Sequence, residues 1–415
     1  MGMKYTEIGM IPEEWNVQSF ADTFRILNNN TYSRAELNYA SGQFRNIHYG
    51  DVLILFPEVL DCIREDVPYI NDEVRISGSA QPLQDGDVVM ADTAEDETVG
   101  KVTEVTNTSD KPVMAGLHTI PCRVKFGEFV PKWLGYYMNS HLYHDQLLPY
   151  IHGTKVSSVS KGSLGDTVII VPKAPEQKRI VDALSDVDAL IVDLQKLIRK
   201  KKDIRQGAMQ MLVTGKKRLP GYYADFEHFT IGELGSLAKM SINPCQEPKT
   251  IFDEYSMPAF DDGAKPQQML GELMLSSRIK LTPNTLLFNK LNVRQRRVWL
   301  VKDCSNNSVC SSEFLPYKSE KIDLSFLKQL LLTDKVTKDF EDMSSGTSNS
   351  QQRITPSDFL KYEISIPSLE EQRKIALILF DMDTEIQRLE EKLSKYQKVK
   401  QGMMEELLTG KVRLM

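Results

Sequence analysis

One segment of this 415-residue chain occurs twice, and this internal repeat constrains the fold more than any other feature. Residues 172–219 align without a gap to residues 367–414 at an offset of 195, and about 19 of the 48 paired positions are identical. Each copy holds a Glu-Gln pair near its start, an internal Gln-Gly and a closing Thr-Gly-Lys-x-Arg-Leu. The repeat predicts two equivalent structural elements within one chain.

Apolar residues in each copy recur at alternating steps of four and three, the spacing of a left-handed coiled-coil seam. The predicted seam residues are Ile180, Leu184, Val187, Ile191, Leu194 and Ile198, and Ile375, Leu379, Met382, Ile386, Leu389 and Leu393. A lone helix of this kind is typical of a core helix or a homodimer zipper. Because two copies lie in one chain, we expect them to pair with each other, antiparallel and intramolecularly.

Glycines punctuate both predicted helices. Gly215 and Gly410 follow the last apolar residues, where a glycine cap ends a helix. Gly207 and Gly402 lie inside the helices, where they predict a break or a close helix approach.

The segments before the two copies have the pattern of equivalent globular units. Ile8-Gly9 and Ile231-Gly232 are matched as their openings. Short alternating runs predict strands, for example at 51–55 and 86–90 in the first unit and at 285–289 and 297–301 in the second. Single helical stretches are expected at 132–148 and 324–340.

The predicted fold class is therefore α+β, with two globular domains separated by two long helices in a pseudo-twofold repeat. The expected boundaries are 1–171, 172–219, 220–366 and 367–415.

Charge is unevenly distributed along the chain. The net charge of −6 divides into −10 for residues 1–171, +6 for 172–219, −2 for 220–366 and 0 for 367–415. Nucleic-acid binding would therefore need local basic patches. The five cysteines are odd in number and form no C-x-x-C pair, and the start has no signal-peptide pattern, so we expect a cytoplasmic protein without a membrane span.

Catalytic signatures are absent from the sequence. It has no phosphate-binding loop, dinucleotide fingerprint, zinc-protease motif or nucleophile elbow. Asp186 and Asp188, like Asp381 and Asp383, lie two apart on a helix and diverge by about 200°, so we interpret them as solvated faces and expect no metal site.

Basic and amide residues suggest a different chemistry. Arginine forks suit guanine edges or phosphates, and Asn or Gln suits adenine. The candidates are Lys290, Asn292, Arg294, Gln295, Arg296 and Arg297 between two expected strands, with the loop residues Gln351, Gln352 and Arg353 and Lys155, Ser157 and Lys161. Strand alternation would turn Arg294 and Arg296 one way and Gln295 and Arg297 the other. A solubilising hairpin or loop is the alternative interpretation of each cluster.

The whole pattern resembles the specificity (S) subunit of type I restriction–modification enzymes. The resemblance covers nearly the entire chain and is carried by the two P-x-x-x-E-Q-x-x-I … Q-G … T-G-K-x-R-L segments and by Ile8-Gly-x-x-Pro12-x-x-Trp15. It implies that residues 1–171 and 220–366 are target-recognition domains that each read half of a bipartite, asymmetric DNA site. Residues 172–219 and 367–415 would be the central and distal conserved helices.

The resemblance also implies the partners. Two modification (methyltransferase) subunits would dock on the helices and use S-adenosylmethionine, and restriction subunits, when present, would use ATP and Mg²⁺, with no cofactor on this chain. Two alternatives stay open at this point: the specificity module of a fused restriction–methylation enzyme, and a coiled-coil scaffold that holds two protein-binding modules and no DNA.

Overall fold

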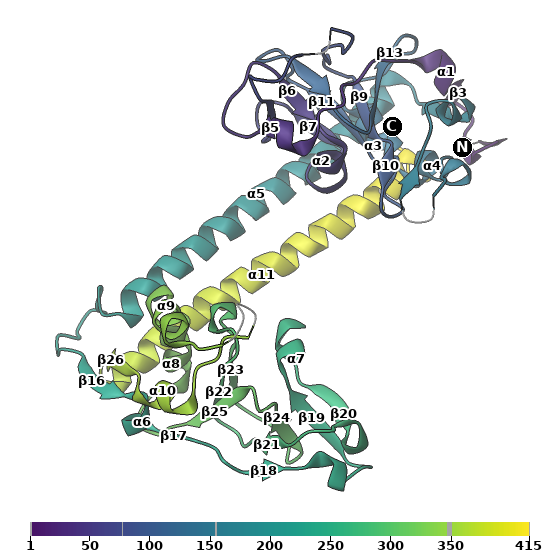
Figure 1. The fold of residues 1–415 in the computed structure, drawn as a ribbon. Helices are drawn as coiled ribbons and strands as arrows, with labels where there is room; N and C mark the ends of the chain where they lie inside the picture. Colours follow the sequence, from purple (N-terminus) through teal and green to yellow (C-terminus); the bar gives the residue numbers. More distant parts are fainter. Residues whose placement is uncertain (1, 77, 154–155, 347–350, 415) are drawn as a thin grey trace. The chain divides into compact units, whose positions relative to one another are not determined.

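The computed structural model describes residues 2–76, 78–153, 156–346 and 351–414, and these form two compact units. The first unit comprises residues 1–194 and 392–415, and the second comprises residues 195–391. Two 40-residue helices, α5 (Ala174–Val213) and α11 (Leu369–Leu408), each belong in part to both units (Figure 1). Because the division falls inside these helices, the four-part domain division at 171, 219 and 366 stays a prediction.

The predicted ends of the long helices are confirmed, but the predicted internal break is wrong. Gly215 and Gly410 take positive φ angles of 72° and 71°, which glycine adopts without a Cβ clash. Helices α5 and α11 run without interruption through Gly207 and Gly402. A Cβ added at either position would meet nothing within 4 Å, so neither glycine permits a close approach.

The first unit is built on two sheets. The five-stranded sheet has the order β4 (Phe24–Ile26), β13 (Thr119–Val124), β9 (Val88–Ala91), β11 (Val102–Thr106) and β7 (Val59–Asp61). The four-stranded sheet has the order β12 (Val113–Ala115), β6 (Arg45–Ile47), β8 (Tyr69–Ile70) and β5 (Leu37–Asn38). The two-stranded pairs are β1 (Met3–Thr6) with β2 (Gly9–Pro12), β3 (Asn16–Ser19) with β15 (Val168–Val171), and β10 (Thr93–Ala94) with β14 (Ser157–Ser158).

The second unit repeats this plan. Its four-stranded sheet has the order β17 (Ser236–Leu237), β25 (Phe314–Lys318), β22 (Thr285–Asn289) and β23 (Val298–Val301). Its five-stranded sheet has the order β18 (Ser241–Ile242), β21 (Arg278–Lys280), β24 (Ser308–Cys310), β19 (Ile251–Tyr255) and β20 (Gln267–Leu270). Strands β16 (Glu227–Thr230) and β26 (Glu363–Ile366) pair as β3 and β15 do, and the parallel pair β19–β24 corresponds to β6–β12.

The helices of the globular parts are short. In the first unit they are α1 (Phe20–Thr23), α2 (Tyr49–Ile54), α3 (Trp133–Met138) and α4 (His141–His144). In the second unit they are α6 (Ile231–Leu234), α7 (Met257–Asp261), α8 (Leu324–Leu331), α9 (Asp334–Met343) and α10 (Pro356–Lys361). The helical stretches expected at 132–148 and 324–340 are therefore each broken into separate helices.

Two further expectations are corrected. Of the residues expected as a strand at 51–55, residues 51–54 lie in α2, because His48 caps the helix by accepting a hydrogen bond from the backbone of Gly50 (3.2 Å). The opening of the second unit at Ile231 corresponds in topology to Phe20, since α6 follows β16 as α1 follows β3. Ile8 instead lies in the turn between β1 and β2, and Gly9 begins β2.

Each globular core includes residues of both long helices. In the first unit the core contains Ile180 and Leu184 of α5 and Leu407 and Leu408 of α11. In the second unit the equivalent residues are Ile375 and Leu379 of α11 and Leu212 and Val213 of α5. Burial of these apolar side chains fixes both helices to each core. Among the described residues, no helix is long and apolar enough to cross a membrane.

Glu104 is a buried carboxylate that holds the start of α3 in the first unit. Its side chain accepts hydrogen bonds from the backbone N–H groups of Lys132 (2.5 Å) and Gly135 (2.9 Å). Burial raises the pKa of Glu104 to about 7, although these hydrogen bonds act in the opposite direction.

This raised pKa predicts a pH-dependent contribution to stability. The unfolded chain releases this proton near pH 4.5 and the folded chain near pH 7, so rising pH favours unfolding across that window. We expect the loss from Glu104 to reach about 3 kcal/mol by pH 8. Urea unfolding at pH 5 and pH 8 should show a weaker pH dependence for Glu104→Gln than for the wild type. Glu95→Gln, at an exposed position, should leave the pH dependence unchanged, and equal behaviour of all three proteins would contradict the prediction.

Candidate nucleic-acid interface and its helical frame

The basic cluster at 290–297 connects β22 to β23, as predicted, but it does not continue either strand. Val293–Gln295 is a 3-10 turn, and Asn292 and Arg296 flank it with positive φ angles of 53° and 51°. The predicted alternation of faces is therefore wrong, because it requires extended backbone. Arg294 and Gln295 are exposed on this turn.

Arg296 and Arg297 each form an ion pair with a carboxylate of the same unit. Arg296 lies 2.7 Å from Asp334, and Arg297 donates two hydrogen bonds to Asp261 at 2.8 and 2.7 Å. These hydrogen bonds raise the pKa of Arg297 and lower that of Asp261. Since the two arginines are consecutive, the expected division of the cluster into Arg294 with Arg296 and Gln295 with Arg297 does not hold.

The second predicted loop lies directly beside this hairpin. The backbone N–H of Asn292 donates to the carbonyl of Gln352 (2.9 Å), and Leu291 and Arg353 form a β-bridge. The carbonyl of half-buried Lys290 accepts from Ile354 (3.1 Å). Residues about 60 positions apart in the chain thus form one polar surface, which we call the hairpin–loop surface: residues 290–297 and 351–353.

The remaining side chains of this surface differ in exposure. Gln351 is exposed, and Gln352 is half-buried. Arg353 is half-buried and lies 3.2 Å from Glu313. The surface therefore mixes exposed polar groups with arginines that already bind acids.

The equivalent region of the first unit has the opposite charge. The segment between β9 and β11 carries Glu95, Asp96 and Glu97, all exposed, where the second unit carries its basic cluster. Hydrogen bonds from Thr98 lower the pKa of Asp96. The same position in the two sheets therefore offers acidic groups in one unit and basic groups in the other.

The candidate residues of the first-unit loop are only partly described. Lys155 lies outside the described residues. Ser157 pairs with Ala94 across β14 and β10, and Lys161 is exposed.

The predicted seam residues lie on the protected faces of α5 and α11. Seven are buried: Ile180, Leu184, Leu194, Ile198, Ile375, Leu379 and Ile386. Five are half-buried: Val187, Ile191, Met382, Leu389 and Leu393. The pattern separates all twelve from the fully exposed positions of the helices.

Ion pairs give the direction of the helix segments within each unit. In the second unit Lys201 pairs with Glu385 (2.7 Å) and Arg218 with Glu371 (2.7 Å), so residue numbers fall along α11 as they rise along α5 and the following tail. In the first unit Asp188 pairs with Lys400 at 2.7 Å, and Glu176 pairs with Arg413. The α5 and α11 segments are antiparallel in both cases.

A buried carboxylate at the start of each long helix binds an arginine from the end of the other copy. In the first unit Arg413 forks onto Glu176, which also accepts a hydrogen bond from the indole of Trp15 (2.9 Å). The Arg413 guanidinium lies over the Trp15 ring, 5.7 Å from its centroid. The hydrogen bonds to Glu176 raise the pKa of Arg413. We call this arrangement the clasp.

The second unit has the same clasp with the two copies exchanged. Arg218 donates two hydrogen bonds to Glu371 at 3.1 and 2.7 Å and lies over the ring of Phe226 at 4.9 Å. Glu371 is fully buried, and without the positive charge of Arg218 its buried carboxylate would strongly destabilise the fold. Phe226 precedes β16 as Trp15 precedes β3, so the two aromatic residues hold equivalent places.

The glutamine beside each clasp carboxylate joins the helix to the globular part. Gln177 donates to the carbonyl of Pro172 (2.8 Å) and accepts from the backbone of Val130 (3.0 Å). Gln372 makes the equivalent contacts and accepts from the backbone of Asp323 (2.9 Å). Both glutamines are buried. The repeated Glu-Gln pair is thus a docking element of the fold.

Sequence reasoning missed the role of two repeated aspartates. Asp188 is half-buried and binds Lys400, so its interpretation as solvated is wrong, whereas Asp383 binds Arg205 (2.8 Å) but stays exposed, as Asp186 and Asp381 do. Their identity in both copies did not reveal these contacts, since Asp186 and Asp381 are identical too and remain exposed. Among the described residues, no three His, Cys, Asp or Glu side chains form a group that could hold a metal ion.

This chain is similar in sequence to proteins of known family. The model of the type I restriction modification DNA specificity domain matches residues 12–205 and 298–400. A putative type I restriction enzyme MjaX specificity subunit of Methanocaldococcus jannaschii is 24% identical over 431 residues, which cover 99% of this chain and 96% of that protein.

Two solved structures share the fold. The S subunit of a type I restriction–modification system from M. genitalium matches with a TM-score of 0.54 at 12% identity, and the match covers 96% of each chain. A chain from a structural study of complex assembly and conformational transition of the type I R-M system matches with a TM-score of 0.56 at 15% identity, covering 97% of this chain and 99% of that one.

The clasp predicts a large effect of its arginine on stability. Arg413→Met would leave the Glu176 carboxylate buried with only the Trp15 indole as a partner, so we expect a loss of about 3 kcal/mol in the free energy of unfolding. Urea unfolding followed by Trp fluorescence measures this. Lys411→Met removes a cation from the same tail where the side chain is exposed, and should cost almost nothing. Equal losses in the two variants would show that Glu176 does not depend on Arg413.

Proposed function

Because this chain belongs to the type I restriction modification DNA specificity domain family, it recognises the DNA target of such a system, and we propose that its two globular units each read half of a bipartite, asymmetric site. In this proposal residues 1–171 and 220–366 are the target-recognition domains. The two long helices form one antiparallel intramolecular coiled coil that separates them.

The observation that carries this proposal is that the two units share one fold but differ in the charge of an equivalent exposed hairpin. Both units have the same core strand order and the same clasp, yet the hairpin after β9 is acidic and the one after β22 is basic. A common frame with different exposed loops suits a protein that presents two different DNA-reading surfaces.

We assign the DNA contact of the second unit to the hairpin–loop surface. Arg294 and Gln295 are exposed there, and both side chains can reach base edges or phosphates. Arg296, Arg297 and Arg353 also belong to this surface, and in this structure they bind acids of the same unit.

The chain has no catalytic role in this proposal. Methylation with S-adenosylmethionine, and cleavage with ATP and Mg²⁺ where it occurs, would belong to two modification subunits and to restriction subunits. The five free cysteines fit the cytoplasm, where such a complex meets DNA. Methyl transfer by the purified chain alone would instead favour the fused-enzyme alternative.

An exposed apolar stripe on α5 supports the docking of a partner subunit. Leu197, Ile204 and Met211 recur every seven residues and are 39%, 47% and 48% exposed. The equivalent positions of α11 hold Lys392, Val399 and Glu406, so the stripe is specific to α5. Aligned apolar groups on an outer helix face are typical of a helix–helix interface. We therefore propose that an apolar helix of a modification subunit packs on α5.

The DNA assignment predicts the effect of substitutions in the hairpin. In the chain assembled with its modification subunits, Arg294→Ala or Gln295→Ala should cost about 1–3 kcal/mol of binding if the side chain reads a base, with relaxed preference at one position of one half-site. A phosphate contact would instead weaken all sequences alike and lower the salt slope by about one.

Titration of matched and half-site-scrambled duplexes at two salt concentrations separates these outcomes. Arg64→Ala, an exposed arginine of the first unit, is the matched control and should retain affinity for both half-sites. If both hairpin variants bind like the wild type, this surface is a solubilising hairpin and does not read DNA.

The docking assignment predicts that charge on the stripe prevents assembly. Ile204→Glu should weaken binding of the modification subunits by about tenfold or more, since it buries a carboxylate in an apolar interface. Gln206→Glu adds the same charge at an exposed polar position and should assemble normally. Analytical ultracentrifugation of the mixtures measures this, and unimpaired assembly of Ile204→Glu would remove α5 from the interface.

A further inference from the structure

Beyond the clasp and the Gln177 contacts, which lie near the start of α5, the first globular part is attached farther along the helices by apolar and by polar contacts. The apolar attachment involves Ile180 and Leu184 of α5, in the main core. The second attachment involves Asp188, eight residues after Ile180 and therefore about 12 Å farther along the helix. A contact at this distance from the start of α5 restrains the angle of the globular part on the helices more strongly than the contacts at the helix start do.

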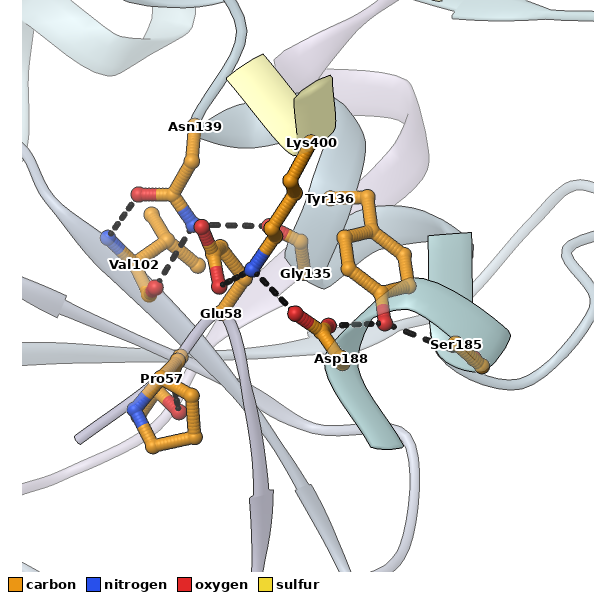
Figure 2. Close-up of polar contacts among 10 residues, drawn as sticks. Pro57, Glu58, Val102, Gly135, Tyr136, Asn139, Ser185, Asp188 and Lys400 are labelled. Carbon is orange, nitrogen blue, oxygen red and sulfur yellow. Dashed lines mark hydrogen bonds and ion pairs between the residues drawn. The ribbon is translucent and has the colours of Figure 1, made fainter. Parts of the chain in front are cut away.

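The second attachment is a lysine between two carboxylates. Figure 2 shows Lys400 of α11 between Glu58 and Asp188, with Nζ–O distances of 2.6 and 2.7 Å. The hydroxyl of Tyr136 in α3 donates to the other oxygen of Asp188 (2.6 Å). Burial lowers the pKa of Lys400, but the charges and hydrogen bonds of Glu58 and Asp188 outweigh it, and the net shift is upward. Lys400 is therefore a charged group held by two helices and the globular part.

Glu58 has a rigid support within the globular part. Its carbonyl accepts from the backbone of Glu104 in β11 (2.9 Å), and the hydroxyl of Thr103 donates to the neighbouring carbonyl of Pro57 (2.8 Å). Gly135 in α3 passes so close that an added Cβ would lie 2.2 Å from the Glu58 carbonyl oxygen. The sheet and α3 thus both fix the backbone from which Glu58 reaches Lys400.

The contributions of the three charged groups are distinct. The pair Lys400–Asp188 joins α11 to α5 and does not involve the globular part. Glu58 is the charged member that belongs to the globular part. Neutralising Glu58 therefore removes the ionic attachment and leaves a one-to-one ion pair between the helices.

The second unit has a related attachment of different chemistry. Arg205 of α5 binds Asp383 of α11 through two hydrogen bonds, at 2.8 and 2.9 Å, and also donates to the side-chain oxygen of Gln329 in α8 (2.7 Å). The globular part here contributes a neutral amide in place of a carboxylate.

We infer that Glu58 is a positioning residue that sets the angle of the first recognition domain on the helices, and thereby the spacing between half-sites that the complex accepts. This inference rests on the proposed reading of a bipartite site. It requires no contact of Glu58 with DNA. The expected consequence of its loss is a change in spacing tolerance without a change in base preference.

The test uses the full chain assembled with its modification subunits and three duplexes. Methylome sequencing supplies the target, and the duplexes carry both half-sites with the natural spacer, or with one base pair fewer or more. We expect Glu58→Gln to lower the preference for the natural spacer about tenfold, the size of one lost charge-assisted hydrogen bond, with unchanged affinity for each isolated half-site. Glu65→Gln, at an exposed position of the same unit, should keep the full preference.

A second variant keeps the test informative if Glu58→Gln folds poorly, which circular dichroism would show. Tyr136→Phe keeps the ring and removes the hydroxyl that donates to Asp188, so it should shift the spacer preference in the same direction by a smaller factor. A wild-type complex with no preference for either half-site would contradict the proposed function. A spacer-selective wild type with variants that keep its selectivity, or that lose affinity for every spacer alike, would overturn the positioning role of Glu58.

Discussion

The structure depends on two buried carboxylates, each of which finds its cationic partner in the other copy of the repeat. Glu176 and Glu371 lie in apolar surroundings at the starts of the two long helices, and each is neutralised by an arginine of the other copy of the repeat. A buried carboxylate without a cation is strongly destabilising, so each unit needs a segment from the opposite end of the repeat. The pairing of the two copies within one chain follows from this requirement.

The same constraint explains why the repeat retains more than an apolar seam. The seam needs only apolar residues at the correct spacing, and the two copies differ at two of its six paired positions, Val187/Met382 and Ile198/Leu393. The clasp needs particular donors and acceptors. The Glu-Gln pair and the closing arginine are accordingly identical in both copies.

Periodic features were predictable from the sequence because they depend on local spacing. The extent of α5 and α11, their glycine ends and strands β22 and β23 agree with expectation. Residues 51–54 adopt a helix because the ring of His48 caps it locally and because Arg34, 17 residues earlier, binds the buried Asp51, which is a tertiary effect.

The candidate site shows the same division between local and tertiary information. Composition marked 290–297 as basic, but the carboxylates that bind Arg296 and Arg297 lie more than 30 residues away in the chain. The adjacency of the hairpin to residues 351–353 arises from backbone hydrogen bonds that no spacing rule predicts. The ion pairs of Asp188 and Asp383 could not be predicted from the repeat, because Asp186 and Asp381 are also identical in both copies and remain exposed.

The interleaving of the two units has a consequence for the order in which the chain can fold during synthesis. The second unit is one continuous segment, 195–391, whereas the first consists of 1–194 and 392–415. Glu176 therefore leaves the ribosome long before Arg413, its partner 237 residues later. At about 5–20 residues per second, the interval is about 10–50 s. During that time the second unit can acquire its own clasp, while the core of the first remains open to solvent and to chaperones. The half of the protein that is made first is thus the half that is finished last.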